Sequence, residues 1–418
     1  MNAAEHRLKV LMMHRGDGMT GGAQIQMNRL RRGLLGAGVD ARVLCREASS
    51  EQAVVMPYRP RVEGLLHGMT SRLGLNDVHL VSSNRVRSLP EVRDADVIDL
   101  HCLHSGTFSY RALPGLCAAK PVVFTIHDMW PFTGHCHASL ECDRWKSGCG
   151  SCPHLDVEPV VRRDATALEW RWKRQAYGKS RFTAVVPSRW MAERMGESLL
   201  AEFPRRVIPH GIDLEVFKPR GKERSREALG LPAKGKVILC AIDNSARPLK
   251  GMALLRDALE QLPEETKRES TLLFFGRASN AELGGLRIPV VNLGHLAHDP
   301  LKVLAYSAAD VLVHPTRAES FGLVALESIA CGTPVVAFGV GGIPELVRPG
   351  ETGMLAQPEN AAELAMRVAE VLGGDGRRMA MAARCREIAE AEYDVSRQVS
   401  DYLDLYQEMQ SEVGGLNG

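Results

Sequence analysis

The sequence predicts an α/β protein built from two doubly wound parallel sheets, and three observations lead to that fold class. The chain has 418 residues, more than one hydrophobic core usually organises, so two domains are expected. Short apolar runs recur along it, each followed by a turn containing Gly, Asp or Pro and then by a segment with helical spacing. The runs form two groups of six, as in two Rossmann-like sheets.

Each run is expected to be one buried strand. The first sheet is predicted from residues 9–14, 41–45, 96–101, 121–127, 182–187 and 206–209, and the second from 236–242, 271–276, 289–293, 310–314, 334–338 and 353–356.

The division between the domains is expected where the chain becomes polar and rich in Pro and Gly, at residues 211–236. We therefore expect a first domain over 1–214 and a second over 215–392. The tail has helical spacing, and its last part, 393–418, is expected to be a helix that returns to the first domain.

Composition and charge favour a folded enzyme in the cytoplasm. Basic and acidic side chains nearly balance at 52 and 50, which argues against a nucleic-acid partner. The apolar run near the start, 10–13, is too short for a signal peptide, and no stretch reaches the ~20 apolar residues that a membrane span needs. In a reducing compartment the ten cysteines are not expected to form a disulfide framework.

Two carboxylates flank a predicted helix in the second domain. Glu319 lies just before a helix expected to start near Ser320 or Phe321, and Glu327 lies eight residues further on, about 12 Å along the helix axis. Such a pair can accept hydrogen bonds from hydroxyls at the two ends of one sugar nucleotide. Alternatively, Glu319 only favours the positive helix end and Glu327 is a surface residue.

A glycine stretch follows the next predicted strand, at 339–342. Its backbone N–H groups could face an anion and, with the preceding helix N-terminus, form a cradle for a diphosphate. The alternative is that glycine here only permits a turn.

The segment RAESFGLVALESIACGTPVVAFGVGGIPELV resembles glycosyltransferase family 4, the large group of retaining GT-B enzymes. Weaker matches extend over nearly the whole chain: GGAQ at 21–24, TIHD at 125–128, VVPSRWMAERM at 185–195 and VIPHGIDLEVFKP at 207–219. The stretch HDMWPFTGHC resembles the branch that builds bacterial exopolysaccharides such as colanic acid. The resemblance implies two Rossmann-like domains facing across a cleft, and retaining sugar transfer with no obligatory divalent metal.

The resemblance also implies roles for individual residues. Glu319 would bind hydroxyls of the transferred sugar and Glu327 the nucleotide ribose, while His127 would face the transferring sugar from the first domain. Lys250 would neutralise the departing diphosphate. The remaining implied donor contacts are Gly21, Gly22, Ser320, Phe321, Gly322 and Leu323.

Single residues also have simpler interpretations, and two positions depart from the family. His127 could be an ordinary histidine at a strand end, and Lys250 an ordinary solvated lysine. An arginine is usual five residues before the lysine, but Ser245 stands there, so that either Arg247 takes the phosphate or Lys250 acts with less help. His210 stands where asparagine is usual, which we expect to affect only a turn.

A cysteine-rich loop over 135–154 is the second most specific feature. Four thiolates can close a tetrahedral zinc site, which would be structural here, although packed free thiols and reversible disulfides are equally compatible. The four candidate ligands are Cys136, Cys142, Cys149 and Cys152.

Two weaker features remain open. All five tryptophans lie between 130 and 190, and those at 170 and 172 alternate with basic residues, which suits either a membrane-surface patch or an amphipathic helix packed on the sheet. Asp94 and Asp96 form an Asp-x-Asp, which is weak as a sign of metal-dependent transfer.

The sequence therefore predicts a glycosyltransferase of cell-surface or exopolysaccharide biosynthesis. Its expected partners are a UDP- or GDP-type sugar donor and a glycan or lipid-linked acceptor, with possible peripheral association at the inner face of the membrane. The alternatives are a sugar-nucleotide epimerase or hydrolase on the same fold, and a catalytically silent sugar-nucleotide-binding subunit.

Overall fold

The computed structural model describes residues 7–19 and 21–416 and divides into two compact units. The first unit contains the chain up to Pro209 and again from Ser396, and the second unit is His210–Val395. The sequence placed these boundaries at 214/215 and 392/393.

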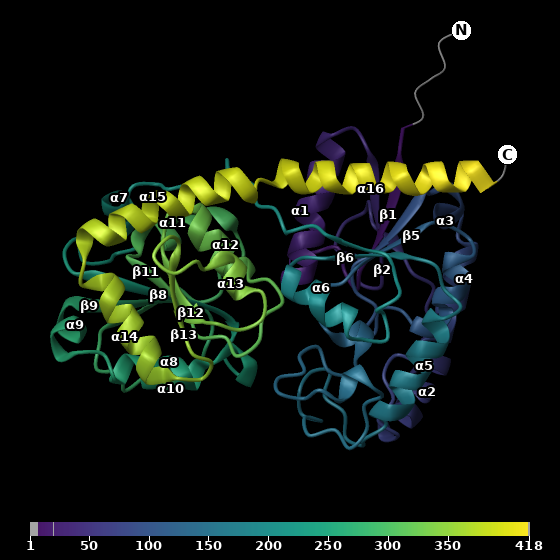
Figure 1. The fold of residues 1–418 in the computed structure, drawn as a ribbon, viewed down its shortest axis with the longest axis horizontal. Coiled ribbons are helices and arrows are strands. Elements are labelled where there is room, and N and C mark those ends of the chain that lie inside the picture. Colours follow the sequence, from purple (N-terminus) through teal and green to yellow (C-terminus); the bar gives the residue numbers. More distant parts are fainter. Residues whose placement is uncertain (1–6, 20, 417–418) are drawn as a thin grey trace, which may run out of the picture. The chain divides into compact units, whose positions relative to one another are not determined.

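The first unit is a parallel sheet in the order β3-β2-β1-β4-β5-β6-β7, covered by helices (Figure 1). Its strands are β1 (Lys9–Met13), β2 (Asp40–Cys45), β3 (Val54–Val55), β4 (Val97–Leu100), β5 (Val122–Thr125), β6 (Thr183–Val186) and β7 (Arg205–Val207). Its α-helices are α1 (Gly22–Gly36), α2 (Pro60–Arg72), α3 (Pro90–Asp94), α4 (Leu113–Cys117), α5 (Thr166–Tyr177), α6 (Arg189–Gly196) and α16 (Val395–Leu416).

Strand order reverses between β1 and β4 in this sheet, since β1 pairs with β2 on one side and with β4 on the other. Doubly wound sheets bind ligands outside the carboxyl ends of their strands at such a reversal. The residues that follow β1, β4 and β5 are therefore well placed for function.

The second unit is a parallel sheet in the order β10-β9-β8-β11-β12-β13. Its strands are β8 (Lys236–Asn244), β9 (Ser270–Arg277), β10 (Val290–Asn292), β11 (Val311–His314), β12 (Val335–Phe338) and β13 (Gly353–Ala356). Its α-helices are α7 (Lys222–Ala228), α8 (Met252–Glu260), α9 (Glu264–Glu269), α10 (Asn280–Leu283), α11 (Asp299–Ala308), α12 (Leu323–Ala330), α13 (Ile343–Leu346), α14 (Ala361–Leu372) and α15 (Asp375–Glu392).

Helix α16 belongs to the first unit through polar contacts with distant parts of the chain. The amide of Gln26 in α1 donates to Gln398 over 2.8 Å, and Arg206 in β7 pairs with Glu408 over 2.6 Å. Its Tyr402 and Tyr406 are buried.

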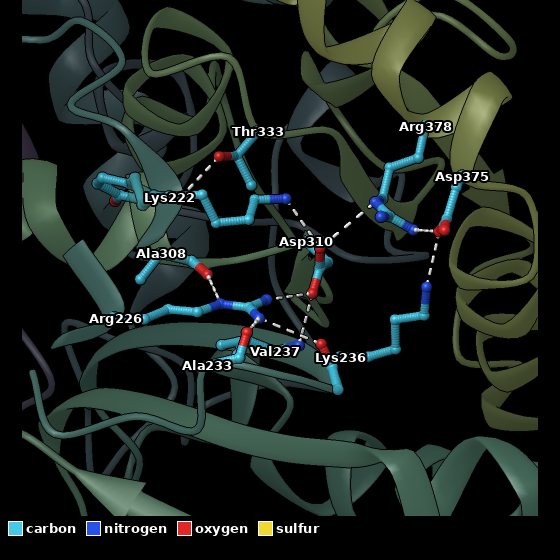
Figure 2. Close-up of polar contacts among 12 residues, drawn as sticks. Lys222, Arg226, Ala233, Lys236, Val237, Ala308, Asp310, Thr333, Asp375 and Arg378 are labelled. Carbon is cyan, nitrogen blue, oxygen red and sulfur yellow. Dashed lines mark hydrogen bonds and ion pairs between the residues drawn. The ribbon is translucent and has the colours of Figure 1, made fainter. Parts of the chain in front are cut away.

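A buried ionic cluster joins four elements at the amino end of β11 (Figure 2). Asp310 is 2% exposed and binds Lys222 at 2.8 Å, Arg226 at 2.7 Å and Arg378 at 3.4 Å. It also accepts the N–H of Val237 at 2.7 Å. These contacts tie α7 and α15 to β8 and β11.

Two local expectations were wrong. The segment 211–236 is not only a linker, because α7 forms within it and its Arg226 enters the buried cluster around Asp310. The first sheet has a seventh strand, β3, whose two residues are too few to give a recognisable apolar run.

No helix among the described residues is long and apolar enough to cross a membrane.

Candidate active site

The loops after β8 and β11 pack directly against each other in the second unit. Gly251 has φ 72°, and a Cβ there would lie 1.8 Å from the carbonyl oxygen of Pro315. Arg317 N–H donates to the carbonyl of Leu249 at 2.8 Å. Because only glycine allows this approach, the contact holds Lys250 beside the loop that carries Glu319.

Glu319 is the centre of a small ionic group at the carboxyl end of β11. Its Oε2 lies 3.3 Å from Nζ of Lys250 and 3.8 Å from Nε2 of His314. Burial opposes the charge of Glu319, but Lys250 and His314 outweigh it and lower its pKa to about 2. Glu319 is therefore an anion at neutral pH and holds two basic side chains at this edge of the sheet.

Glu327 is buried, at 5% exposed, and is not the surface residue of the alternative interpretation. The hydroxyl of Tyr306 on α11 donates to its Oε2 over 3.0 Å. A buried carboxylate with a tyrosine partner has a fixed orientation.

Helix α12 begins later than predicted, at Leu323 rather than near Ser320 or Phe321. Gly322 has φ 108°, and a Cβ there would lie 2.7 Å from Cδ1 of Ile343, so glycine is required. The first backbone N–H groups of α12 follow directly after Gly322, which is two residues after Ser320. The N–H groups of a first helical turn have no carbonyl partner within the helix. Phe321 is buried beneath this turn.

The glycine stretch 339–342 supports this loop instead of presenting a row of N–H groups to an anion. Gly342 N–H donates to the carbonyl of Glu319 at 3.0 Å, and the N–H groups of Gly339, Val340 and Ile343 bind backbone carbonyls too. A Cβ on Gly341, where φ is 57°, would lie 1.7 Å from the carbonyl of Glu319. Glycine here permits the turn and the close approach, as the alternative interpretation held, while anion binding by the helix N-termini stays a prediction.

The two departures from the family lie near this site. Ser245 is buried and its hydroxyl donates to the carbonyl of Arg277 at 2.9 Å, while Arg247 is exposed on the same loop as Lys250. The ring of His210 is buried and meets the ring of Phe321 edge-on at 4.9 Å. His210 therefore packs beneath the mouth of α12, and its effect is not confined to a turn.

In the first unit, the structure places His127 in a group of polar side chains at the carboxyl ends of β1, β4 and β5. Its Nε2 lies 3.0 Å from Nδ1 of His101, whose Nε2 lies 3.1 Å from Oδ2 of Asp99. His14 follows β1, and burial, with His101 adding to it, lowers its pKa to about 3. His104 pairs with Asp128 at 2.9 Å.

Gly21 and Gly22 lie at the start of α1, after β1. Gly21 is the N-cap with φ 77°, and Gly22 is the first helical residue. A Cβ on Gly21 would meet nothing within 4 Å, so its positive φ, not crowding, selects glycine.

Comparison with known protein families shows the family of this chain. The family described as "Glycosyltransferase Family 4" matches residues 20–216, and that described as "Glycosyl transferases group 1" matches residues 221–390. A D-inositol 3-phosphate glycosyltransferase of Arthrobacter sp. is 30% identical over 367 residues, covering 84% of this chain and 81% of the relative. The chain belongs to glycosyltransferase family 4.

Other relatives agree with this assignment. The D-inositol 3-phosphate glycosyltransferase of Xylanimonas cellulosilytica is 29% identical to this chain, and the match covers 94% of this chain and 92% of the relative. Sucrose-phosphate synthase of Thermosynechococcus elongatus has a TM-score of 0.69 at 20% identity, covering 97% of this chain and all of that one. HepE of Anabaena, solved with UDP and glucose, has a TM-score of 0.68 at 19% identity, covering 96% and 100%. These structures confirm the GT-B fold, while the finer likeness to exopolysaccharide enzymes stays a prediction.

The cysteine loop of this glycosyltransferase holds free thiols in the structure. Within residues 7–19 and 21–416, no group of three or more His, Cys, Asp or Glu side chains is arranged to hold a metal ion. Cys149 Sγ accepts the N–H of Gly134 at 3.2 Å, and Cys152 Sγ lies 3.5 Å from Nε2 of His135. Burial raises the pKa of Cys136 to about 12 and that of Cys149 to about 11. The structural zinc site stays a prediction, and metal analysis of protein purified without chelators tests it.

Lys173 is a residue that the sequence did not single out. It is fully buried on α5, and its Nζ donates to the carbonyls of Trp130 at 2.6 Å and Thr133 at 3.0 Å. The same ammonium group lies 3.4 Å from the centre of the Trp130 ring. Lys173 thus fixes the loop that follows His127 and Asp128, although nothing in its sequence context distinguishes it from a solvated lysine.

The tryptophans and the Asp-x-Asp have structural roles. Trp130, Trp145 and Trp170 are at most 6% exposed, and the indole N–H of Trp170 donates to the carbonyl of Trp145, so α5 packs Trp170 inward. Asp96 accepts the N–H of Lys9, and Asp94 pairs with its ammonium group, at the amino end of β1.

Proposed function

We propose that this glycosyltransferase moves a sugar from a nucleoside diphosphate sugar to a hydroxylated acceptor, with retention of configuration and no obligatory divalent metal. The observation that supports this most directly is the group of Glu319, Lys250 and His314 at the carboxyl end of β11. It sets an anion that can bind sugar hydroxyls beside a cation that can bind phosphate.

The donor roles follow from chemistry and position. A carboxylate accepts hydrogen bonds from vicinal hydroxyls, so Glu319 is proposed to hold the transferred sugar and Glu327 the ribose. The N-terminus of α12, with Phe321, Gly322 and Leu323, favours a negative phosphate group. Gly21 and Gly22 at the start of α1 are proposed to serve the diphosphate in the same way.

The leaving diphosphate develops negative charge as the glycosidic bond breaks, and a positioned cation stabilises that charge. Lys250, only 3.3 Å from Glu319, is the proposed cation, with Arg247 as an exposed helper. This is why no divalent metal is required. With the acceptor hydroxyl attacking on the face that the diphosphate leaves, the configuration is retained and the leaving phosphate takes the proton.

The donor is proposed to carry UDP or GDP. HepE, which shares the fold, has been solved with UDP and with UDP-glucose. At 19% identity these structures support the class of donor and not the particular sugar.

A cavity of about 690 Å³ in the first unit is the proposed acceptor site. Asp77 and Ser105 in its wall have φ values of 57° and 60°, an uncommon conformation that concentrates at functional sites. Buried Nδ2 of Asn76 and Nδ1 of His79 have no hydrogen-bond partner among the described atoms. Polar groups of this kind suit a polyhydroxylated acceptor such as a glycan or the sugar of a lipid-linked intermediate.

Calorimetric titration with UDP, GDP and their sugars tests the donor proposal, followed by a transfer assay with each donor that binds. Glu319→Ala and Lys250→Ala are expected to lose most transfer while remaining folded. Normal turnover in both would refute the roles. Donor consumption without an acceptor would favour an epimerase or hydrolase, and binding without any turnover a silent subunit.

We also propose that α2 contacts a membrane surface. Val62, Leu65, Met69 and Leu73 recur at near-helical spacing and are 48–71% exposed, with Arg61 and Arg72 exposed beside them. An apolar helix face flanked by arginines suits anionic headgroups.

Vesicle flotation with anionic lipids tests this contact. Leu65→Glu is expected to abolish flotation, whereas Met379→Glu, at a methionine 70% exposed on α15, leaves it unchanged. Equal flotation of both variants would exclude α2 as the contact.

A further inference from the structure

A continuous chain of hydrogen bonds connects the deepest part of the first unit to His127. Asp99 lies on β4 and is fully buried, His101 follows the same strand at 2% exposed, and His127 follows β5 and is half-buried. The distances along the chain are 3.1 Å from Asp99 Oδ2 to His101 Nε2 and 3.0 Å from His101 Nδ1 to His127 Nε2. The chain thus runs from the core to a residue that substrate can reach.

The chemistry of the carboxylate fixes where the protons lie. An ionised carboxylate only accepts hydrogen bonds, so His101 must carry a proton on Nε2. In a neutral His101, Nδ1 is then an acceptor and can only receive the Nε2–H of His127. A neutral His127 in turn keeps an unprotonated Nδ1 on the opposite side of its ring.

Helix α16 supplies the other partners of this carboxylate. The hydroxyl of Tyr406 donates to Asp99 Oδ2 at 2.7 Å, and Thr125 donates to Oδ1 at 2.8 Å. Tyr402 lies 3.0 Å from the Thr125 hydroxyl, whose one proton goes to Asp99, so Tyr402 is the donor. Burial, with the charge of Asp99 next, raises the pKa of both tyrosines, so both hydroxyls stay protonated.

The ionisable neighbours do not compete for these atoms. His14 is kept neutral by burial, and its Nδ1 accepts the N–H of Gly16. His104 and Asp128 are paired with each other at 2.9 Å. Among the described residues, Asp99 therefore accepts side-chain hydrogen bonds from His101, Thr125 and Tyr406, which is a complete set of donors for a buried carboxylate.

We infer that Asp99, His101 and Tyr406 are positioning residues, which hold His127 with its proton on Nε2 and its ring in one orientation, ready for the substrate that the proposed function gives it. The inference rests on the proposed function for the identity of that substrate. It adds that the last helix of the chain takes part in sugar transfer, through Asp99 and without touching the substrate.

Nitrogen-15 NMR of histidine-labelled protein tests the proton positions without any assay of activity. In the wild type, the shifts of His101 and His127 are expected to be those of the Nε2–H tautomer. Tyr406→Phe removes one donor to Asp99 and keeps the ring, and it is expected to shift the His101 and His127 signals. Tyr177→Phe is the matched control, because Tyr177 is a buried tyrosine of the same unit whose hydroxyl has no partner among the described atoms.

Steady-state kinetics tests the consequence for transfer. Tyr406→Phe is expected to lower kcat about three- to tenfold, the effect of one hydrogen bond, and to leave KM for the donor unchanged. Asp99→Asn removes the acceptor that sets both tautomers and is expected to lower kcat by about 100-fold or more. Tyr177→Phe is expected to keep wild-type kcat.

The outcomes separate this inference from the proposed function. Unchanged NMR signals and unchanged kcat in Tyr406→Phe would overturn the positioning role, and this variant suffices if Asp99→Asn does not fold. A rise in donor KM at constant kcat would overturn it as well. If no nucleotide sugar supports transfer, the proposed function fails while the NMR result still decides the proton positions.

Discussion

An acidic residue with basic partners lies at each end of strand β11, buried Asp310 at one end and half-buried Glu319 at the other, and the two groups differ in how completely they are bonded. At the amino end, Asp310 has three cations and a backbone N–H within 3.4 Å, and Arg226 also binds three carbonyl oxygens. At the carboxyl end, Glu319 has Lys250 at 3.3 Å and His314 at 3.8 Å. Both ring nitrogens of His314 are buried without a hydrogen bond to any described atom.

Under the proposed function, this difference distinguishes a cluster that holds the fold from one that is ready for a ligand. Buried polar groups are normally satisfied, and a fully bonded cluster such as that of Asp310 gains nothing from a further partner. The looser group around Glu319 leaves hydrogen-bonding capacity unused, which a sugar or phosphate can take up. Substitution of Asp310 should therefore mainly lower stability, and substitution of Glu319 should mainly lower activity.

The largest expected effect is on stability, at the amino end. Asp310→Ala leaves buried Arg226 without its carboxylate, and we expect the free energy of unfolding to fall by about 3–5 kcal/mol. Denaturant unfolding measures this. Asp375→Ala is the control, since Asp375 pairs with Arg378 at the surface of the same cluster, and it should leave stability nearly unchanged.

At the carboxyl end of β11, we expect substitution of Glu319 to lower activity. Glu319→Gln keeps the shape and removes the charge, and transfer is expected to fall by about 100-fold or more with the protein still folded at the assay temperature. Comparison of kcat and donor affinity measures it. Glu359→Gln, at an exposed acid paired with Arg317, is the control, and an equal loss there would remove the distinction between the two groups.

A smaller effect is expected from pH. The pKa of Glu319 is lowered to about 2 from 4.5, so its charge adds to stability above about pH 4.5, and that contribution is lost as the pH falls toward 2. Wild type should be more stable than Glu319→Gln at pH 7, and this gap in the free energy of unfolding should be about 2 kcal/mol smaller at pH 3. Denaturant titrations at pH 7 and pH 3 give the two differences, and a gap that widens in acid would contradict the prediction.

The smallest expected effect concerns Arg247. It is exposed on the loop that carries Lys250, and Arg247→Ala is expected to weaken the binding of a nucleoside diphosphate about two- to fivefold, as a solvated charge would. Calorimetry measures this, with Lys250→Ala as the stronger comparison. A larger loss from Arg247→Ala would show that it is the main phosphate contact.

Much of the fold could be predicted because buried parallel strands are continuous apolar runs. All six strands of the second sheet and six of the seven in the first lie within a few residues of their predicted positions. The misses have physical reasons: β3 has only two residues, and α7 is polar because its Arg226 is buried in an ion pair and not among apolar side chains.

The residues of the candidate site could be predicted where a motif carries them, but not where partners meet from distant parts of the chain. Glu319, Glu327 and Lys250 were singled out by spacing and resemblance. Asp99 and His101 are separated from Tyr406 by about 300 residues, and no local pattern connects them. The internal hydrogen bonds of the glycine stretch could not be predicted either, because free and bonded N–H groups look the same in a sequence.

The return of α16 to the first unit also fixes the order in which the protein can be completed. During synthesis, residues 210–395 leave the ribosome before α16 does, so the second unit can close its own core while the first still awaits its last helix. Until then, the carboxylate of Asp99 has no tyrosine to bind and Gln26 no partner in Gln398. The first unit, whose synthesis begins first, is therefore the last to be completed.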